Sequence, residues 1–291
     1  MFFHIPPQLI ALAGALSYAI SGIAARRGLR YSTPITVTLV SLTIHATGLW
    51  TVLYLSGGVP RVPPWAVFLF VVSGTLQPVI RLLTYAGIFY LGASGGTTLR
   101  SSHPLFSTAI AILVLGERAD WWVLLGTVLI VTGIILISWQ PAVRREAYPW
   151  WHVGFPLGAA LLAGISHPLR RYALSQADEP LLYAATIGLV SLVWIGGYLL
   201  SPLPGERPLW DKRAIKPFVV AGAFETLGIL LVIVALSVGQ VVIVSPIVAT
   251  SPLWILVGTW LFLRGIEKLS LPTVLGALLV VAGTVAISVV R

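Results

Sequence analysis

The chain has 291 residues, of which 57% are hydrophobic and only 9% are charged, and its mean hydropathy is +0.96. Such a composition leaves too little polar surface to coat a water-soluble globule, so lipid must serve as the solvent. The net charge of +9 lies in short segments between apolar runs, which favours anionic lipid headgroups over nucleic acid as partners, and the absence of cysteine excludes disulfides, thiolate metal sites and thiol nucleophiles.

Apolar runs of about 20 residues, the length that a helix needs to cross a bilayer, recur along the chain. The runs are continuous rather than alternating, which indicates helices and not a β-barrel. Because Arg26 and Arg27 follow the first run, the reverse of a signal peptide, we expect that run to remain as a span. We predict an all-α, polytopic membrane protein with ten transmembrane helices, at residues 8–25, 34–54, 65–90, 94–115, 121–139, 152–174, 180–200, 215–237, 241–263 and 270–290.

The sequence contains two related halves. Phe70-Val71-Val72-x-Gly74 recurs as Phe218-Val219-Val220-x-Gly222 at an offset of 148 residues, and Pro104-Leu105 falls on Pro252-Leu253 at the same offset. Each half holds five spans, an odd number, so the second half enters the membrane from the opposite side. Two inverted five-helix repeats, at residues 1–145 and 146–291, are typical of secondary transporters with a site near the midplane between the repeats. The alternative is that the duplication repeats a unit of helix packing and has no role in transport.

Leu115-Gly116-Glu117-Arg118, followed by Gly126 and Gly133, resembles the EamA domain of the drug/metabolite transporter superfamily. The second copy reads Gly265-Ile266-Glu267-Lys268, without the Leu-Gly that the family has before the Glu. The resemblance covers essentially the whole chain. It implies a multi-pass transporter of the cell inner membrane, not an enzyme, whose central cavity is lined mainly by the early odd-numbered helices of each half and by the fourth and ninth helices. Members export amino acids and other metabolites, or exchange sugars and phosphorylated compounds.

Few charged residues fall inside the predicted spans. We assign only Arg81, Arg100 and Glu225 to span interiors and count Arg170 among the loop residues. A charge within the membrane costs roughly 2.5–3.5 kcal/mol on insertion scales, so it normally faces a cavity and has a partner. Gln77 and Arg81, four residues apart, share a helical face, and Gln77 aligns with Glu225. Either Arg81 pairs with Glu225, or the excess guanidinium binds an anionic substrate; Arg100 either faces the cavity or snorkels to the headgroups.

Prolines at equivalent positions, Pro104 and Pro252, break the fourth and ninth helices near mid-membrane, which suits either a gate or a static kink. His103 and His167 are expected either to bind protons or substrate, or simply to form interior hydrogen bonds. The predicted substrate-binding residues are Arg81, Gln77, Tyr85, Arg100, His103, Glu225 and Trp254, and the predicted gating residues are Pro78, Pro104, Pro246 and Pro252.

These features favour a secondary-active carrier that exports or exchanges a small polar metabolite with an anionic group, driven by protons or by exchange, since no nucleotide-binding motif is present. A lipid or lipid-phosphate flippase is the main alternative, followed by a membrane-embedded lipid-modifying enzyme. We expect no cofactor, no metal and no nucleic acid, and a monomer or homodimer. Counting Lys and Arg by side gives eleven against five, which places both termini outside the cytoplasm, whereas ten-helix relatives usually have both inside.

Overall fold

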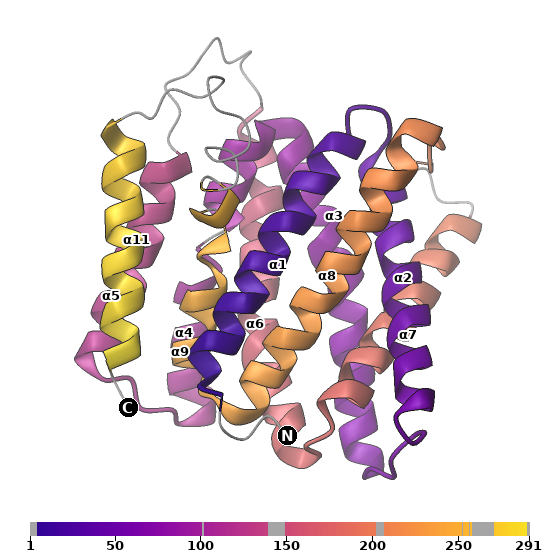
Figure 1. The fold of residues 1–291 in the computed structure, drawn as a ribbon, viewed down its shortest axis with the longest axis horizontal. Helices are drawn as coiled ribbons and strands as arrows, with labels where there is room; N and C mark the ends of the chain where they lie inside the picture. Colours follow the sequence, from indigo (N-terminus) through magenta and orange to yellow (C-terminus); the bar gives the residue numbers. More distant parts are fainter. Residues whose placement is uncertain are drawn as a thin grey trace.

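A computed structural model describes residues 5–100, 102–138, 149–201, 207–251, 253–255, 257 and 271–289. These residues form ten α-helices and one 3-10 helix and contain no strand (Figure 1). Several helices have a proline in the first turn, where its missing N–H has no intrahelical partner to lose. The elements are α1 (Pro7–Gly28), α2 (Pro34–Leu55), α3 (Pro64–Arg100), α4 (His103–Leu115), α5 (Trp121–Ser138), η1 (Trp150–Val153), α6 (Gly154–Gln176), α7 (Pro180–Leu200), α8 (Lys212–Val238), α9 (Val241–Val248) and α11 (Leu271–Val289).

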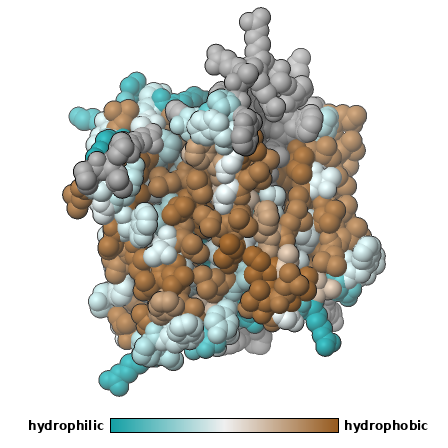
Figure 2. Space-filling model, turned by 180° about the vertical axis from the view of Figure 1, so that it is seen from behind, coloured by the Kyte–Doolittle hydropathy of each residue, from teal (hydrophilic) through white to brown (hydrophobic). Residues whose placement is uncertain are grey.

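The face of the molecule shown in Figure 2 carries a broad apolar belt with polar groups gathered at its two edges. In the described part of the chain, five segments are long and apolar enough to cross a membrane: α1, α2, Pro64–Gly87 of α3, α7 and α8. Helices α4, α5, α9 and α11 contribute shorter apolar stretches. Helix α6 is less apolar because it carries His167, Arg170 and Arg171. The predicted all-α, polytopic membrane fold is confirmed.

The helices pair across the two halves of the chain. Helix α1 packs along α8, and α3 packs along α6 (Figure 1). The two pairs are equivalent, because α6 is the repeat counterpart of α1 and α8 is that of α3. The related helices α5 and α11 also lie side by side, with Gly126 against Gly283 and Gly133 against Gly276. Residue numbers rise along α5 as they fall along α11, so these two helices are antiparallel. The inverted relation expected from the odd number of spans is therefore confirmed.

Gly126 and Gly133 of α5, and their repeat counterparts Gly276 and Gly283 of α11, allow the two backbones to touch. A Cβ atom on Gly133 would lie 2.5 Å from the Gly276 carbonyl oxygen, and one on Gly126 would lie 2.6 Å from that of Gly283. Small residues serve this purpose in membrane proteins, where helices associate through close packing rather than through a hydrophobic driving force. These motif positions therefore hold the fold together at the edge of the bundle.

Two helices break at equivalent points. The predicted boundary between the third and fourth spans, at residues 91–93, is wrong: α3 continues to Arg100, and the chain turns at Ser102. The predicted ninth span is likewise interrupted, since α9 ends at Val248 and a turn includes Thr250. Ser102 and Thr250 are 148 residues apart, the repeat offset. Inside a bilayer a helix satisfies its backbone polar groups locally, which favours continuation of α3 through the predicted gap.

Candidate substrate site

Polar bonds at two equivalent positions of the repeat join the halves. Arg170 on α6 donates from Nη2 to the Gln77 side-chain oxygen on α3, at 2.8 Å. Ser21 on α1 donates to the Glu225 carboxylate on α8, at 2.9 Å. Gln77 and Glu225 occupy equivalent positions in the repeat, and each bonds a residue of the opposite half.

The arginines at this interface have unused donors. Arg81 is 3% exposed and donates to the Ser41 hydroxyl on α2 through Nη1. Among the described residues, Nε and Nη2 of Arg81 and Nε of Arg170 are buried without a hydrogen-bond partner. Leaving a buried donor unsatisfied costs about 1–3 kcal/mol, and more for a charged group. A ligand with acceptor oxygens would form hydrogen bonds with these donors and so remove that cost.

Four charged side chains, carried by α3, α6 and α8, act electrostatically on the Tyr18 hydroxyl of α1. Within the described part of the chain, no nitrogen of Arg81 lies within 4.0 Å of the Glu225 carboxylate, so the Arg81–Glu225 ion pair considered above is not formed. With one carboxylate for three guanidiniums, the group carries an excess of two positive charges. Its members are Arg81, Arg100, Arg170 and Glu225.

Arg100 belongs to this interior group because of where α3 ends. It lies in the last turn of the long α3 helix, and not near the start of a fourth span as the predicted range 94–115 placed it. The C-terminal end of a helix carries partial negative charge, which favours a cation there. The Arg100 carbonyl oxygen accepts a hydrogen bond from Nδ1 of His103, at 3.3 Å. The break between α3 and α4 is thus lined by a cation and an imidazole.

A polar network joins the broken helices to α6. Nδ1 of His167 lies 3.0 Å from the Ser245 hydroxyl on α9, and that hydroxyl lies 2.6 Å from the Ser107 hydroxyl on α4. Ser107 donates to the Pro104 carbonyl oxygen at 3.2 Å. The ring of His167 meets that of His103 edge to face, with centroids 5.4 Å apart. The first turn of α4 and the centre of α9 therefore share one hydrogen-bond chain with α6.

The remaining predicted residues lie around this interior group or beyond the described part. Tyr85 is buried in a cluster with Phe218 and Val37. Trp254 is half-buried, and its Nε1 is a buried donor without a partner among the described residues. Pro78 lies inside α3, Pro104 in the first turn of α4 and Pro246 inside α9, whereas Pro252 lies outside the described residues.

Arg170 is the residue that sequence reasoning misplaced. It lies inside α6 and is 4% exposed, although it was assigned to a loop. Two adjacent arginines near the end of an apolar run resembled the basic end of a span. The available signal was that Arg170 follows His167 by three residues and Ser166 by four, a spacing that places Arg170 on the same side of the helix as each of them. A polar face on an otherwise apolar helix indicates a residue directed to the bundle interior.

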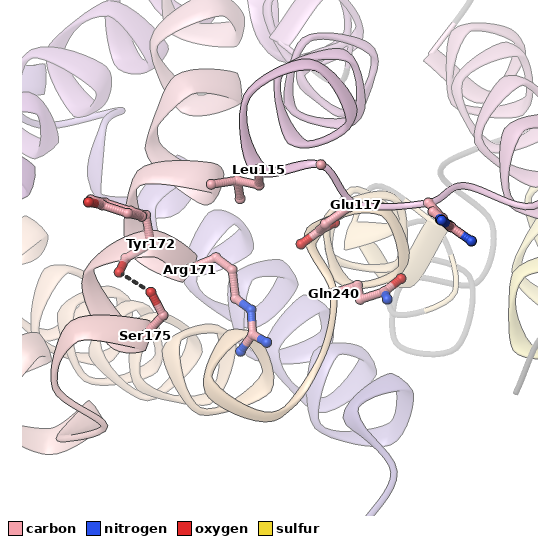
Figure 3. A pocket seen from close by; sticks show the side chains of 8 residues that line it. Leu115, Glu117, Arg171, Tyr172, Ser175 and Gln240 are labelled. Carbon is pink, nitrogen blue, oxygen red and sulfur yellow. Dashed lines mark hydrogen bonds between the residues drawn. The ribbon is translucent and has the colours of Figure 1, made fainter.

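A second polar feature lies where α8 turns into α9. Glu117 accepts hydrogen bonds from the backbone N–H groups of Val241 and Val242, both at 3.0 Å, and so caps the α9 N-terminus. Arg171 donates to the carbonyl oxygens of Leu236 and Ser237, at 2.9 and 2.7 Å, at the C-terminus of α8. Both side chains line a pocket of about 510 Å³ (Figure 3). The negative Glu117 thus lies at the N-terminus of α9, and the positive Arg171 lies at the C-terminus of α8. Helix dipoles favour this arrangement.

The Leu-Gly-Glu sequence explains how Glu117 reaches α9. Leu115 ends α4, and Gly116 follows with φ of +67°, a left-handed conformation that glycine adopts without strain. The backbone N–H of Glu117 then bonds the Ala111 carbonyl oxygen at 3.1 Å, which closes the turn. The residues that resemble the EamA motif therefore build a cap between the halves.

The family model for the EamA-like transporter family matches residues 6–139 and again residues 150–289. The chain belongs to the EamA-like transporter family. It is accordingly an integral membrane protein and a transporter of the drug/metabolite type. A solved structure described only as "Crystal structure of protein" is similar in fold, with a TM-score of 0.75 and 15% identity over 98% of this chain and 99% of that one. A comparison with curated proteins found no match.

Proposed function

We propose that this EamA-family transporter is a secondary-active carrier, exporting or exchanging a small metabolite with an anionic group across the inner membrane. The observation that supports the substrate class is the excess of guanidinium at the interface of the halves. Arg81 and Arg170 keep buried N–H donors without partners in the described part of the chain. Carboxylate and phosphate oxygens are the acceptors that a guanidinium binds best, through paired hydrogen bonds.

The paired helix breaks support alternating access. Discontinuous helices in inverted repeats form the midplane sites of many secondary transporters, and rocking of one repeat against the other exposes such a site to each side in turn. Here the turns at Ser102 and Thr250 are equivalent, and Pro104 and Pro246 lie beside them. A proline frees a backbone carbonyl and weakens the helix locally, which suits a hinge. We assign the gating role to these breaks, together with Pro78.

Counterflow exchange in proteoliposomes tests the proposal. Vesicles loaded with one unlabelled anion are presented with the same anion in labelled form, using inorganic phosphate, glycerol 3-phosphate, lactate, succinate, citrate and glutamate in turn. We expect exchange of at least one of these anions, and none of the neutral sugar glucose or the cation choline. Exchange of glucose or choline but of no anion would refute the proposed substrate class.

Variants of the two interior arginines test the site. Arg81→Gln and Arg170→Gln should each reduce anion exchange by about tenfold or more, because a charge-assisted hydrogen bond contributes about 1.5–3 kcal/mol. Arg213→Gln is the matched control, since Arg213 is exposed and pairs with Asp211 outside the bundle interior. Thermal melting in detergent verifies that each variant is folded. Unaltered exchange by folded Arg81→Gln would show that the assigned site is wrong.

The flippase alternative predicts a basic groove open to lipid. Burial of Arg81 and Arg170 to 3% and 4% exposure counts against such a groove and supports a soluble solute. A lipid-modifying enzyme would require acid, base or metal ligands close together; the described residues hold no group of three His, Cys, Asp or Glu side chains that could bind a metal ion. A fluorescent-lipid scrambling assay on the same vesicles separates the flippase from the carrier.

A further inference from the structure

We propose that His103 and His167 form a proton-binding site, through which the carrier moves about one proton together with each anion. The inference rests on the proposed function and adds the coupling ion and its direction. It starts from two buried imidazoles in contact, at 5.4 Å between ring centroids, where α4, α6 and α9 meet. No other pair of histidine rings in the described residues is in contact.

The hydrogen-bond directions leave both imidazoles able to accept a proton. A carbonyl oxygen can only accept, so Nδ1 of His103 carries the hydrogen that bonds the Arg100 oxygen, and Nε2 holds the lone pair. The same rule assigns the donors in the hydrogen-bond chain that ends at the Pro104 carbonyl oxygen. Ser107 donates to it, Ser245 therefore donates to Ser107, and His167 must donate from Nδ1 to Ser245. In this arrangement His167 also keeps its lone pair on Nε2.

Electrostatics link this proton to the anion. The charges that act on the pair come from Arg100 on α3 and Arg170 on α6, while α5 and α9 contribute no titratable side chain. The same interior group includes Arg81 and Glu225, and its excess of two positive charges opposes a further one. A bound anion offsets that excess, so anion and proton favour each other's binding. Such coupling is reciprocal, because each ligand raises the affinity of the other by the same factor.

The position of the pair connects protonation to movement. His103 begins α4 directly after the break, and His167 is hydrogen-bonded to the residue before Pro246 in α9. A proton taken from water on one side adds to an imidazole Nε2, accompanies the anion through the change of access, and leaves to water on the other side. No other bond is made or broken. Anion and proton therefore travel in the same direction, as in a symporter.

Calorimetry on the purified, detergent-solubilised protein measures the proton directly. The probe is whichever of the six anions exchanges fastest in counterflow, titrated in two buffers of different ionisation enthalpy. We expect an uptake of about one proton per anion bound, and therefore an anion affinity that falls as the pH rises. Binding without proton uptake would overturn this inference alone.

Variants assign the proton to the pair. In the double variant His103→Gln, His167→Gln the anion should bind more weakly, because the coupled proton is lost. Proton uptake per anion bound should fall towards zero, and a pH gradient should no longer drive accumulation. His152→Gln, the same change at a histidine of η1 that stacks on Tyr90, is the matched control and should behave as wild type. Proton uptake that persists in the double variant would overturn the assignment. If no anion exchanges at all, the proposed function fails first, and this inference fails with it.

Discussion

Glu117 holds the first turn of α9, and replacing it by alanine should loosen the contact between the halves. Its carboxylate accepts from two backbone N–H groups, both at 3.0 Å, and puts a negative charge at a helix N-terminus. Loss of one capping bond costs about 0.5–2 kcal/mol, and a charge in a partly buried position at a helix end contributes up to about 2 kcal/mol. Because the two contributions overlap, we expect Glu117→Ala to cost about 2 kcal/mol. Glu117→Gln keeps one acceptor and should cost roughly half as much.

The assay is thermal unfolding in detergent, followed by far-ultraviolet circular dichroism. A loss of about 2 kcal/mol corresponds to a melting temperature lower by about 4–8 °C. Asp178→Ala removes an exposed carboxylate and is the control, with no expected shift. If Glu117→Ala melts together with the wild type, the carboxylate does not stabilise α9 and the reasoning from the cap is refuted.

Two further predictions concern packing and pH. Gly133→Ala should destabilise the protein by about 1–3 kcal/mol through overpacking, because its Cβ would lie 2.5 Å from the Gly276 carbonyl oxygen; Gly196→Ala, with open space around it, should not lower the melting temperature. At the start of α8, hydrogen bonds from the Arg213 side chain and backbone lower the pKa of Asp211 below its ordinary value of 3.8. The resulting stabilisation is present above that value and lost as the pH falls through the folded pKa, so Asp211→Ala should flatten this acid side of a melting-temperature profile.

The sequence alone predicted the features that depend on local pattern or on the repeat. Apolar length indicates spans, because a bilayer forces each segment to satisfy its own backbone. The offset between Pro104 and Pro252 indicated two equivalent breaks, and the turns at Ser102 and Thr250 lie at that offset. The shared helical face of Gln77 and Arg81 followed from a spacing of four residues. Both side chains are buried and bonded to other helices.

Only the tertiary structure decided which polar groups meet. Arg170 and Gln77 are separated by 93 residues and Glu117 and Val241 by 124, so no local pattern connects them. The repeat offset relates equivalent positions, but it does not say which partner each one contacts across the interface. Inside a bilayer a polar side chain must find its partner on a neighbouring helix, and which helix is adjacent depends on the packing of the whole bundle.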